Sequence, residues 1–279
     1  MSVLFVHGGV SGLGRSRVPS LRAAFDRATG SALDMIESAV CALEDHPELN
    51  AGSGAVLDRE GRLELDAGIS VGHGRTAGVA NVAVRHPISL ARRVLESTPH
   101  VLITGEGAIS LGADMKTIYP SPEQLERWEK AAAAGELSPE TYGSPEHVDT
   151  VGAVALDDEG TLAAGSSTGG VFGKLPGRVG DAPIFGAGIY TSSHVAVVGT
   201  GVGEIFLRTL ACARVANLVE AGASPQEACE EIVSFLGTEA DTASGLLALD
   251  AKGQVGAAFR GGSWAVEGPD GPLQPMRLT

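Results

Sequence analysis

The sequence predicts an α+β protein with mainly antiparallel strands, built as one sheet or two stacked sheets covered by helices. The first observation is that strand-like apolar runs come in hairpins, such as residues 150–156 with 161–165 and residues 245–250 with 256–259. The second observation is that helical patterns come in pairs rather than one after each strand. Both observations disfavour alternating βαβ units and a parallel sheet.

The chain begins with an apolar run, residues 3–6, which predicts a buried strand ended by the loop His7-Gly8-Gly9. Residues 19–45 predict one helix, because apolar side chains recur there at helical spacing and Pro47 follows its end. The other elements expected in this part are a hairpin of residues 55–57 and 62–66 with Gly61 in its turn, a strand over 79–84, and a helix over 89–96 capped by Ser89.

Residues 113–149 differ in character from the rest of the chain. They contain four prolines, many acidic side chains and an alanine run, with few apolar residues that could anchor them to a core. A loose helix is expected around residues 124–134, inside what the composition predicts to be a mobile linker. This linker ends abruptly at Asp149-Thr150, where a nearly continuous apolar strand begins.

The elements expected after the hairpin that begins at Thr150 are a loop, a strand, a pair of helices and a final hairpin. A long glycine-rich loop covers residues 168–181, and a strand follows over 194–199. A helix is expected over 205–220, and a second helix starts at Ser224-Pro225, with Ser224 as its N-cap and proline in its first turn. The hairpin of residues 245–259 is expected to be the last one.

Charge and composition exclude several classes of partner. The net charge of −14 disfavours binding to nucleic acid or to an anionic membrane surface, and no apolar run approaches the roughly 18 residues that span a bilayer. The N-terminal sequence is expected to form a strand rather than a signal peptide. The three cysteines match no zinc or disulfide motif, so we expect free thiols and a cytoplasmic protein.

Thr150 is the first residue that points to chemistry. A threonine hydroxyl is a weak nucleophile unless a base activates it. A free α-amino group, with a reference pKa of about 7.7–8.0, can be that base. Such an amine exists at Thr150 only if the bond from Asp149 is cut. Spacing alone favours the simpler interpretation that Thr150 is an ordinary threonine at the start of a strand.

Several motifs together resemble plant-type L-asparaginases, also called isoaspartyl peptidases. The stretch from His147 to Asp157 resembles the processing site of that family, and Ser166-Ser167-Thr168-Gly169-Gly170 resembles the motif that follows it. The matching runs occur in order over nearly the whole chain, so the combination is specific. The other matching runs are residues 43–52, 105–108, 174–181, 187–188 and 199–204.

The resemblance implies a fold and a maturation pathway. The fold of that family is a four-layer αββα sandwich, the N-terminal-nucleophile hydrolase fold. Autoproteolysis between Asp149 and Thr150 would give an α subunit, residues 1–149, and a β subunit, residues 150–279. Both subunits would form one structural domain, and residues 113–149 would be the linker at the end of the α subunit.

The resemblance also implies roles for single residues. Thr150 would be the nucleophile, Thr168 would orient its hydroxyl, and Asn50 would lie close to it. The Thr200 hydroxyl and the Gly201 N–H would form the oxyanion hole and contact the substrate.

Arg178 and Asp181 are the implied substrate-binding residues. Arg178 would bind the substrate α-carboxylate, since a guanidinium makes two-point contacts with carboxylates, and Asp181 would bind the α-ammonium. The implied reaction is hydrolysis of L-asparagine and of N-terminal isoaspartyl peptides through a β-aspartyl ester on Thr150, with release of L-aspartate. No cofactor is implied for catalysis.

The family further implies a structural sodium ion and a homodimer of processed αβ units. The ion would be held by main-chain carbonyls of one early loop, which leave no side-chain signature in a sequence. The matching positions are Leu43, Glu44, His46, Leu49, Ala51 and Ser53.

Other interpretations of these residues stay open from the sequence. Arg178 and Asp181 could simply pair across a loop, and Gly201-Val202-Gly203 could be a phosphate-binding loop. The activity could be that of a glycosylasparaginase, although that group usually has asparagine where Gly169 stands. The chain could also be a ligand-binding scaffold that is never processed. Residues 70–74 depart from the family pattern and leave the leaving-group side of the pocket undefined.

Overall fold

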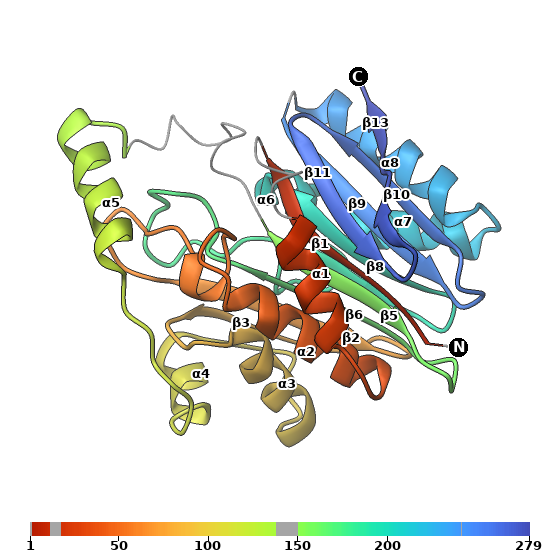
Figure 1. Cartoon of the computed structure of the whole chain (residues 1–279), viewed down its shortest axis with the longest axis horizontal. Coiled ribbons are helices and arrows are strands. Elements are labelled where there is room, and N and C mark those ends of the chain that lie inside the picture. The colour runs from red at the N-terminus through yellow and green to blue at the C-terminus, as the bar shows by residue number, and fades with distance from the viewer. Residues whose placement is uncertain (1, 12–17, 138–149, 241) are drawn as a thin grey trace.

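The computed structural model describes residues 2–11, 18–137, 150–240 and 242–279. Two β-sheets stack face to face, and helices cover the outer face of each (Figure 1). Helices α1, α2 and α3 pack on the first sheet, while α7 and α8 pack on the second. The strands are mainly antiparallel. The structure therefore confirms the predicted four-layer αββα sandwich and excludes alternating βαβ units.

The first sheet has eight strands in the order β12-β11-β1-β5-β6-β2-β3-β4. Its neighbours are antiparallel except for β3 and β4, which are parallel. In chain order its strands are β1 (Val3–Ser11), β2 (Leu65–Val71), β3 (Arg75–Val82), β4 (Leu102–Thr104), β5 (Val151–Leu156), β6 (Leu162–Thr168), β11 (Ser263–Gly268) and β12 (Gly271–Leu273).

The second sheet has five strands in the order β13-β10-β9-β8-β7, with only β10 and β13 parallel. Its strands are β7 (Ile189–Thr191), β8 (Val195–Gly201), β9 (Ser244–Asp250), β10 (Val255–Arg260) and β13 (Met276–Leu278). The helices are α1 (Val18–Arg27), α2 (Ala32–Glu44), α3 (Pro87–Ser97), α4 (Gly105–Leu111), α5 (Pro122–Ala134), α6 (Gly203–Thr209), α7 (Ala211–Glu220) and α8 (Pro225–Glu239), and a short 3-10 helix is η2 (Gly52–Gly54).

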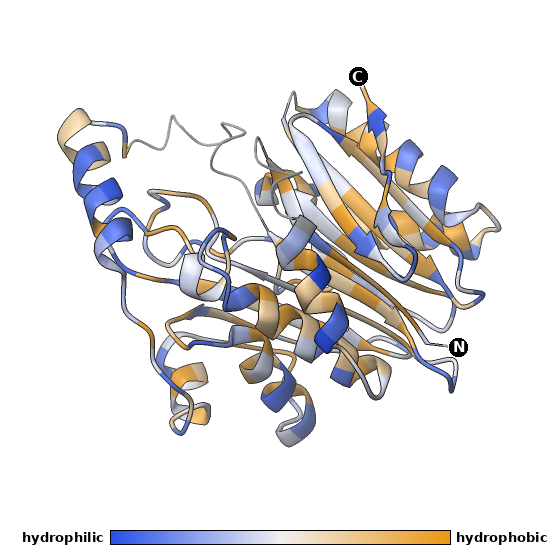
Figure 2. Cartoon of the chain, in the orientation of Figure 1, coloured by the Kyte–Doolittle hydropathy of each residue, from blue (hydrophilic) through white to orange (hydrophobic). Residues whose placement is uncertain are grey.

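Three apolar layers hold this sandwich together. One lies between the two sheets, and it includes Val154 of β5, Val198 of β8 and Trp264 of β11. The other two lie under the helices on either side. Figure 2 shows the matching pattern, with apolar residues along the strands and polar residues on the outward sides of the helices. Strands buried on both faces explain why residues 151–156 and 195–198 are apolar without alternation.

Two predicted helices are each divided in two. The helix expected over residues 19–45 is broken at Gly30, whose φ of +101° lies in the left-handed region, and Ser31 then caps α2 with a capping box. The helix expected over 205–220 is broken at Leu210, which has a φ of +52° and ends α6 before α7 begins. The prediction missed the second break because leucine rarely adopts this conformation.

The strand predictions were wrong at three places. The first strand does not end at His7 but continues to Ser11 through a β-bulge at the two glycines. Residues 55–57 and 62–66 flank a tight turn, closed by Asp58 N–H to Arg62 O at 2.9 Å, and residues 65–66 begin β2, which pairs with β3 and β6 rather than with residues 55–57. The hairpin of residues 245–259 is not the last, because strands β11, β12 and β13 follow it.

The remaining local predictions are largely confirmed. The hairpin that follows Thr150 is β5 with β6, and Ser224 caps α8 with Pro225 in its first turn. The helix expected over 89–96 is α3, but it begins earlier, at Pro87, so Ser89 lies inside it. The loose helix of the linker is α5, capped by Ser121, whereas residues 138–149 lie outside the described residues. None of the described helices is long and apolar enough to cross a bilayer.

Candidate active site

Thr150 and Thr168 meet where the two central strands of the first sheet lie side by side. Thr150 directly precedes β5, Thr168 is the last residue of β6, and Val151 pairs with Ser167 in the antiparallel register. The Thr150 hydroxyl donates a hydrogen bond to the Thr168 hydroxyl at 3.3 Å, and Thr150 is only 4% exposed. The predicted nucleophile and its partner are therefore in contact, while Asp149 lies outside the described residues.

Asn50 supports the turn that follows Thr168. Its side-chain Nδ2 donates to the carbonyl of Gly170 at 2.7 Å, and its main-chain carbonyl accepts from Gly169 N–H at 3.0 Å. Gly170 N–H donates in turn to the Thr168 hydroxyl at 2.9 Å. A chain of hydrogen bonds thus connects Asn50 to the Thr150 hydroxyl through this turn and the Thr168 hydroxyl.

Gly169 lies in that turn with no room for a side chain. A Cβ atom at position 169 would lie 2.5 Å from Asn50 Oδ1 and 2.6 Å from Ala55 Cβ, distances that packed atoms do not adopt. A larger residue here would displace the turn that holds Thr168. The local packing therefore disfavours the asparagine that a glycosylasparaginase usually has at this position.

Arg178 pairs with Glu204, not with Asp181. Its Nε and Nη2 atoms donate to the two carboxylate oxygens of Glu204, each at 3.0 Å, and the Arg178 side chain is 11% exposed. Glu204 lies at the start of α6, where a carboxylate is favoured by the helix dipole. The guanidinium is therefore fixed, with Nη1 directed toward Gly170 and Gly180. The alternative of an Arg178–Asp181 surface pair is wrong.

Asp181 is a buried carboxyl group beside this guanidinium. It is 3% exposed, and its Oδ2 atom has no hydrogen-bond partner among the described residues. Burial raises its pKa to about 7, and the charge of Arg178 opposes this shift only partly. A cationic group placed against Oδ2 would remove the cost of the buried charge. The geometry thus suits binding of an ammonium group.

Thr200 and Gly201 end β8, which packs from the second sheet against β5 and β6. The Thr200 hydroxyl is fully buried and has no partner among the residues that the structure describes. Gly201 has a φ of +146°, and a Cβ atom there would lie 2.6 Å from the carbonyl of Ala243. A buried hydroxyl with an unused proton beside a glycine suits an oxyanion hole.

The loop that follows α2 is tightly folded, with main-chain carbonyl oxygens close to its glycines. A Cβ atom at Gly52 would lie 2.3 Å from the carbonyl oxygen of Glu44, and one at Gly54 would lie 2.2 Å from that of Leu49. The Ser53 hydroxyl donates to Glu44 O at 2.9 Å. Such a tight, carbonyl-lined loop has the oxygen donors that hard cations prefer, so these residues fit the sodium site that the resemblance implies.

A separate side-chain cluster near this loop consists of Cys41, Glu44 and His86. Their potential ligand atoms lie within 4.8 Å of one another. His86 Nδ1 lies 3.3 Å from Glu44 Oε2, and this contact raises the pKa of His86. Because Glu44 and His86 are already hydrogen-bonded to each other, we assign no metal to the cluster. Thiols of all three cysteines are free.

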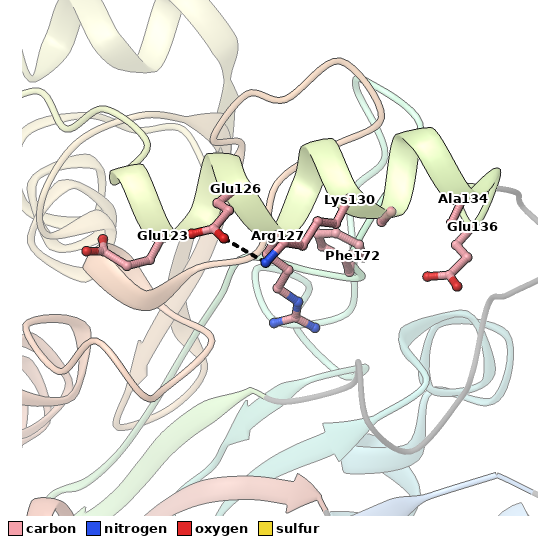
Figure 3. Close-up of a pocket in the computed structure, with 8 residues that line it drawn as sticks. Glu123, Glu126, Arg127, Lys130, Ala134, Glu136 and Phe172 are labelled. Atoms are coloured by element: carbon pink, nitrogen blue, oxygen red, sulfur yellow. Dashed lines mark hydrogen bonds and ion pairs between the residues drawn. The ribbon is translucent and has the colours of Figure 1, made fainter.

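A pocket of about 510 Å³ lies along α5 (Figure 3). Arg127 stacks on the ring of Phe172, with the guanidinium carbon 4.7 Å from the ring centroid. Trp128 Nε1 donates to the carbonyl of Asp58 at 3.0 Å. These contacts join α5 to Asp58, in the segment that follows Asn50, and to Phe172, in the loop that follows Thr168. The residues that line the pocket include none of those predicted to act in the site.

Two polar residues near the site have roles that the sequence did not predict. Glu204 was part of a matching motif, but nothing in the sequence indicates that it pairs with Arg178, 26 positions earlier. Asp66 is fully buried in β2 and accepts a hydrogen bond from the N–H of Gly180, which lies between Arg178 and Asp181 in the chain. The only sequence signal was the acidic residue itself, since an aspartate in a buried strand needs partners.

The four-layer sandwich, with a buried threonine at the start of a central strand, is consistent with the fold of N-terminal-nucleophile hydrolases. The profile of the family described as Asparaginase matches residues 20–267. The chain belongs to this family.

Known relatives cover most of the chain. An isoaspartyl peptidase of Salmonella typhimurium is 40% identical over 92% of this chain and 92% of its own. A plant-type L-asparaginase of Thermococcus kodakarensis is 40% identical over 92% of this chain and 93% of its own. An isoaspartyl peptidase/L-asparaginase of Rattus norvegicus is 38% identical over 86% of this chain and 74% of its own. These relatives come from three different organisms and have closely similar names.

Proposed function

We propose that this chain is an autoprocessing threonine hydrolase that acts on L-asparagine and on N-terminal isoaspartyl peptides. The names of its relatives support both substrates. The observation that carries the mechanism is the buried contact between the Thr150 and Thr168 hydroxyls at the start of a central strand. Cleavage between Asp149 and Thr150 divides the chain into the α subunit, residues 1–149, and the β subunit, residues 150–279.

In this mechanism the new α-amino group of Thr150 takes the proton from its own hydroxyl. The Thr150 Oγ1 atom attacks the side-chain carbonyl of the substrate, and a tetrahedral oxyanion forms. The Thr200 hydroxyl and the Gly201 N–H donate to this oxyanion. The leaving amine departs with the proton, which leaves a β-aspartyl ester on Thr150. Water then hydrolyses the ester and releases L-aspartate.

Recognition of the substrate α-groups is assigned to Arg178 and Asp181, which we call the substrate clamp. Asp181 binds the α-ammonium through its unpartnered Oδ2 atom. Because Glu204 occupies Nε and Nη2 of Arg178, the α-carboxylate is bound by Nη1. This differs from the two-point contact that the sequence resemblance implies, and it places Glu204 behind the guanidinium as its support.

Three further features belong to the proposal. A sodium ion bound by the carbonyls of the loop after α2 would stabilise the segment that carries Asn50, and catalysis would need no cofactor. The processed αβ unit would form a homodimer, and light scattering tests this by measuring the mass of the particle in solution. The free thiols suit a reducing compartment, so we place the protein in the cytoplasm.

Intact mass and activity test the proposal together. The purified chain is expected to yield two fragments that meet at Asp149/Thr150 and to hydrolyse L-asparagine and β-aspartyl dipeptides. Thr150→Ala is expected to stay whole and inactive, because it lacks the hydroxyl that attacks. Processing of Thr150→Ala at this bond would remove Thr150 from its role. A wild-type chain that stays whole and inactive would favour an unprocessed scaffold, and preference for glycosylated asparagine would favour a glycosylasparaginase.

A further inference from the structure

We infer that Asp66 is a positioning residue that fixes the substrate clamp relative to the nucleophile. This inference rests on the proposed function, because it concerns recognition of the substrate α-groups. Asp66 accepts hydrogen bonds from two main-chain N–H groups. It acts through the main chain of the loop that carries Arg178 and Asp181.

The position of Asp66 in the sheet links the two parts of the site. It lies on β2 and pairs with Thr168 of β6 in the antiparallel register. Its Oδ2 atom accepts Gly180 N–H at 3.1 Å, and Gly180 lies between the two clamp residues. One side chain therefore connects the strand that holds Thr168 to the clamp loop.

The second oxygen of Asp66 is also occupied. Oδ1 accepts Asn81 N–H at 3.0 Å, and Asn81 has a φ of +55°, a conformation uncommon outside glycine. Both partners are main-chain donors, so both oxygens must be acceptors. A carboxylate meets this need and an asparagine side chain does not, because its NH₂ group would face a second donor.

The residue just before β2 fixes the earlier part of the same loop. Glu64 Oε2 accepts Gly177 N–H at 2.8 Å, and the Glu64 carbonyl accepts from Lys174 Nζ at 2.6 Å. Lys174 is fully buried, so its ammonium group is directed inward rather than into solvent. Two alternate residues of one extended segment, Glu64 and Asp66, thus hold the second half of this loop at Lys174, Gly177 and Gly180.

The loop leaves little tolerance for movement. A Cβ atom at Gly180 would lie 2.9 Å from Arg178 Nη1, so the main chain at Gly180 lies directly against the guanidinium. If the hydrogen bond from Gly180 N–H to Asp66 is lost, the atom proposed to bind the α-carboxylate loses its backing. We therefore expect loss of Asp66 to weaken substrate binding more than the chemical step.

The decisive experiment compares Asp66→Asn with Asp157→Asn. Asp157 is also buried and also accepts main-chain donors with both oxygens, from Ala32, Glu159 and Thr161, but it lies at the β5–β6 turn away from the clamp. Both variants are expected to lose stability. Only Asp66→Asn is expected to raise KM for L-asparagine at least about tenfold with a smaller change in kcat, while processing at Thr150, which needs no clamp, proceeds at the wild-type rate.

A second pair of variants covers the case in which Asp66→Asn does not fold. Glu64→Ala removes the acceptor for Gly177 N–H, and Glu64→Gln keeps one. The first is expected to raise KM and the second to restore it. Unchanged KM in Asp66→Asn, or in Glu64→Ala if the first does not fold, would overturn the inference. A wild-type chain that neither processes nor hydrolyses would instead overturn the proposed function.

Discussion

Asp181 shows how a single buried residue couples recognition to pH. Its folded pKa of about 7 lies above the ordinary value of 3.8. A carboxyl group with a raised folded pKa holds its proton more tightly in the folded state. Its contribution to stability is therefore greatest below about pH 3.8 and is lost as pH rises through about 7. The substrate ammonium needs ionised Asp181, and the protein without substrate disfavours this ionised form.

Replacing Asp181 by asparagine tests this account. Asp181→Asn is expected to raise the free energy of unfolding at pH 8, by up to about 4 kcal/mol, and to change it little at pH 4. Urea unfolding at both pH values measures the difference. In the wild type, kcat/KM is expected to fall below about pH 7, and kcat to fall at lower pH, because the bound ammonium lowers the pKa of Asp181. Equal stability of the wild type and Asp181→Asn at pH 8 would contradict the role of Asp181. So would a fall of kcat and kcat/KM at the same pH.

Glu204 is a second residue whose effect can be predicted from the structure. Glu204→Gln loses the two-point ionic contact with Arg178, and the guanidinium loses its fixed orientation. We expect KM for L-asparagine to rise about threefold to tenfold, since an ion pair in which only the carboxylate is exposed stabilises its geometry by roughly 1 kcal/mol. Glu231→Gln on the exposed side of α8 is the control. A fall in KM would mean that Glu204 competes with the substrate for Arg178.

At the residue scale, the sequence predicts chemistry better than it predicts partners. Thr150, Thr168 and Asp181 were predicted from the resemblance of their motifs to those of a family, and the structure places Thr150 and Thr168 in contact. Glu204 could not be assigned to Arg178, because an ion pair between a loop and a helix depends on the three-dimensional path of the chain. The same holds for Asp66 and Gly180, which are 114 positions apart.

At the element scale, strands buried on both faces were readily predicted and helix breaks were not. Residues 151–156 are apolar throughout, and a continuous short run of this kind is typical of a central strand. The break between α1 and α2 had a visible signal, since Gly30 and Ser31 are typical of a helix end and an N-cap. The break at Leu210 had none, because tertiary packing imposes a conformation that leucine does not favour.

The start of α6 is the element that bounds the clamp. Its first residue is Gly203. A Cβ atom at this position would lie only 2.7 Å from Asp181 Oδ1 and 2.9 Å from Arg178 Nη2. Gly203→Ala is therefore expected to displace both side chains and to raise KM at least about tenfold (about 1.4 kcal/mol). Steady-state kinetics with L-asparagine measures this change.

A matched glycine serves as the control for that variant. Gly107 lies inside α4, and the nearest atom to a Cβ there is 3.5 Å away, an ordinary contact. Gly107→Ala is expected to leave KM unchanged and to stabilise the protein by about 0.5–1 kcal/mol, since alanine is the better helix former. If both variants behave alike, the effect at Gly203 is not due to contact with the clamp.

At the scale of the whole molecule, the proposed cleavage divides the first sheet in an unusual way. Strand β1 comes from the segment before Thr150, but its two neighbours, β5 and β11, come from the segment after it. Strand β6 pairs with β2 across the same division. In the sheet order β12-β11-β1-β5-β6-β2-β3-β4, blocks of strands from the two proposed subunits therefore alternate. Strands β12-β11 and β5-β6 come from the β subunit, and β1 and β2-β3-β4 come from the α subunit.

This alternation predicts how the processed protein behaves. Separating the subunits would break the β1–β5, β1–β11 and β2–β6 pairings together and expose the apolar layer that α2 forms with β5 and β6. We expect the two chains to elute together in gel filtration under native conditions, and to appear as separate bands only on a denaturing gel. Unfolding should remain a single cooperative transition, because the first sheet is complete only with strands from both chains and the second sheet packs on it. Release of a folded β subunit from the processed protein without denaturant would contradict the single structural domain.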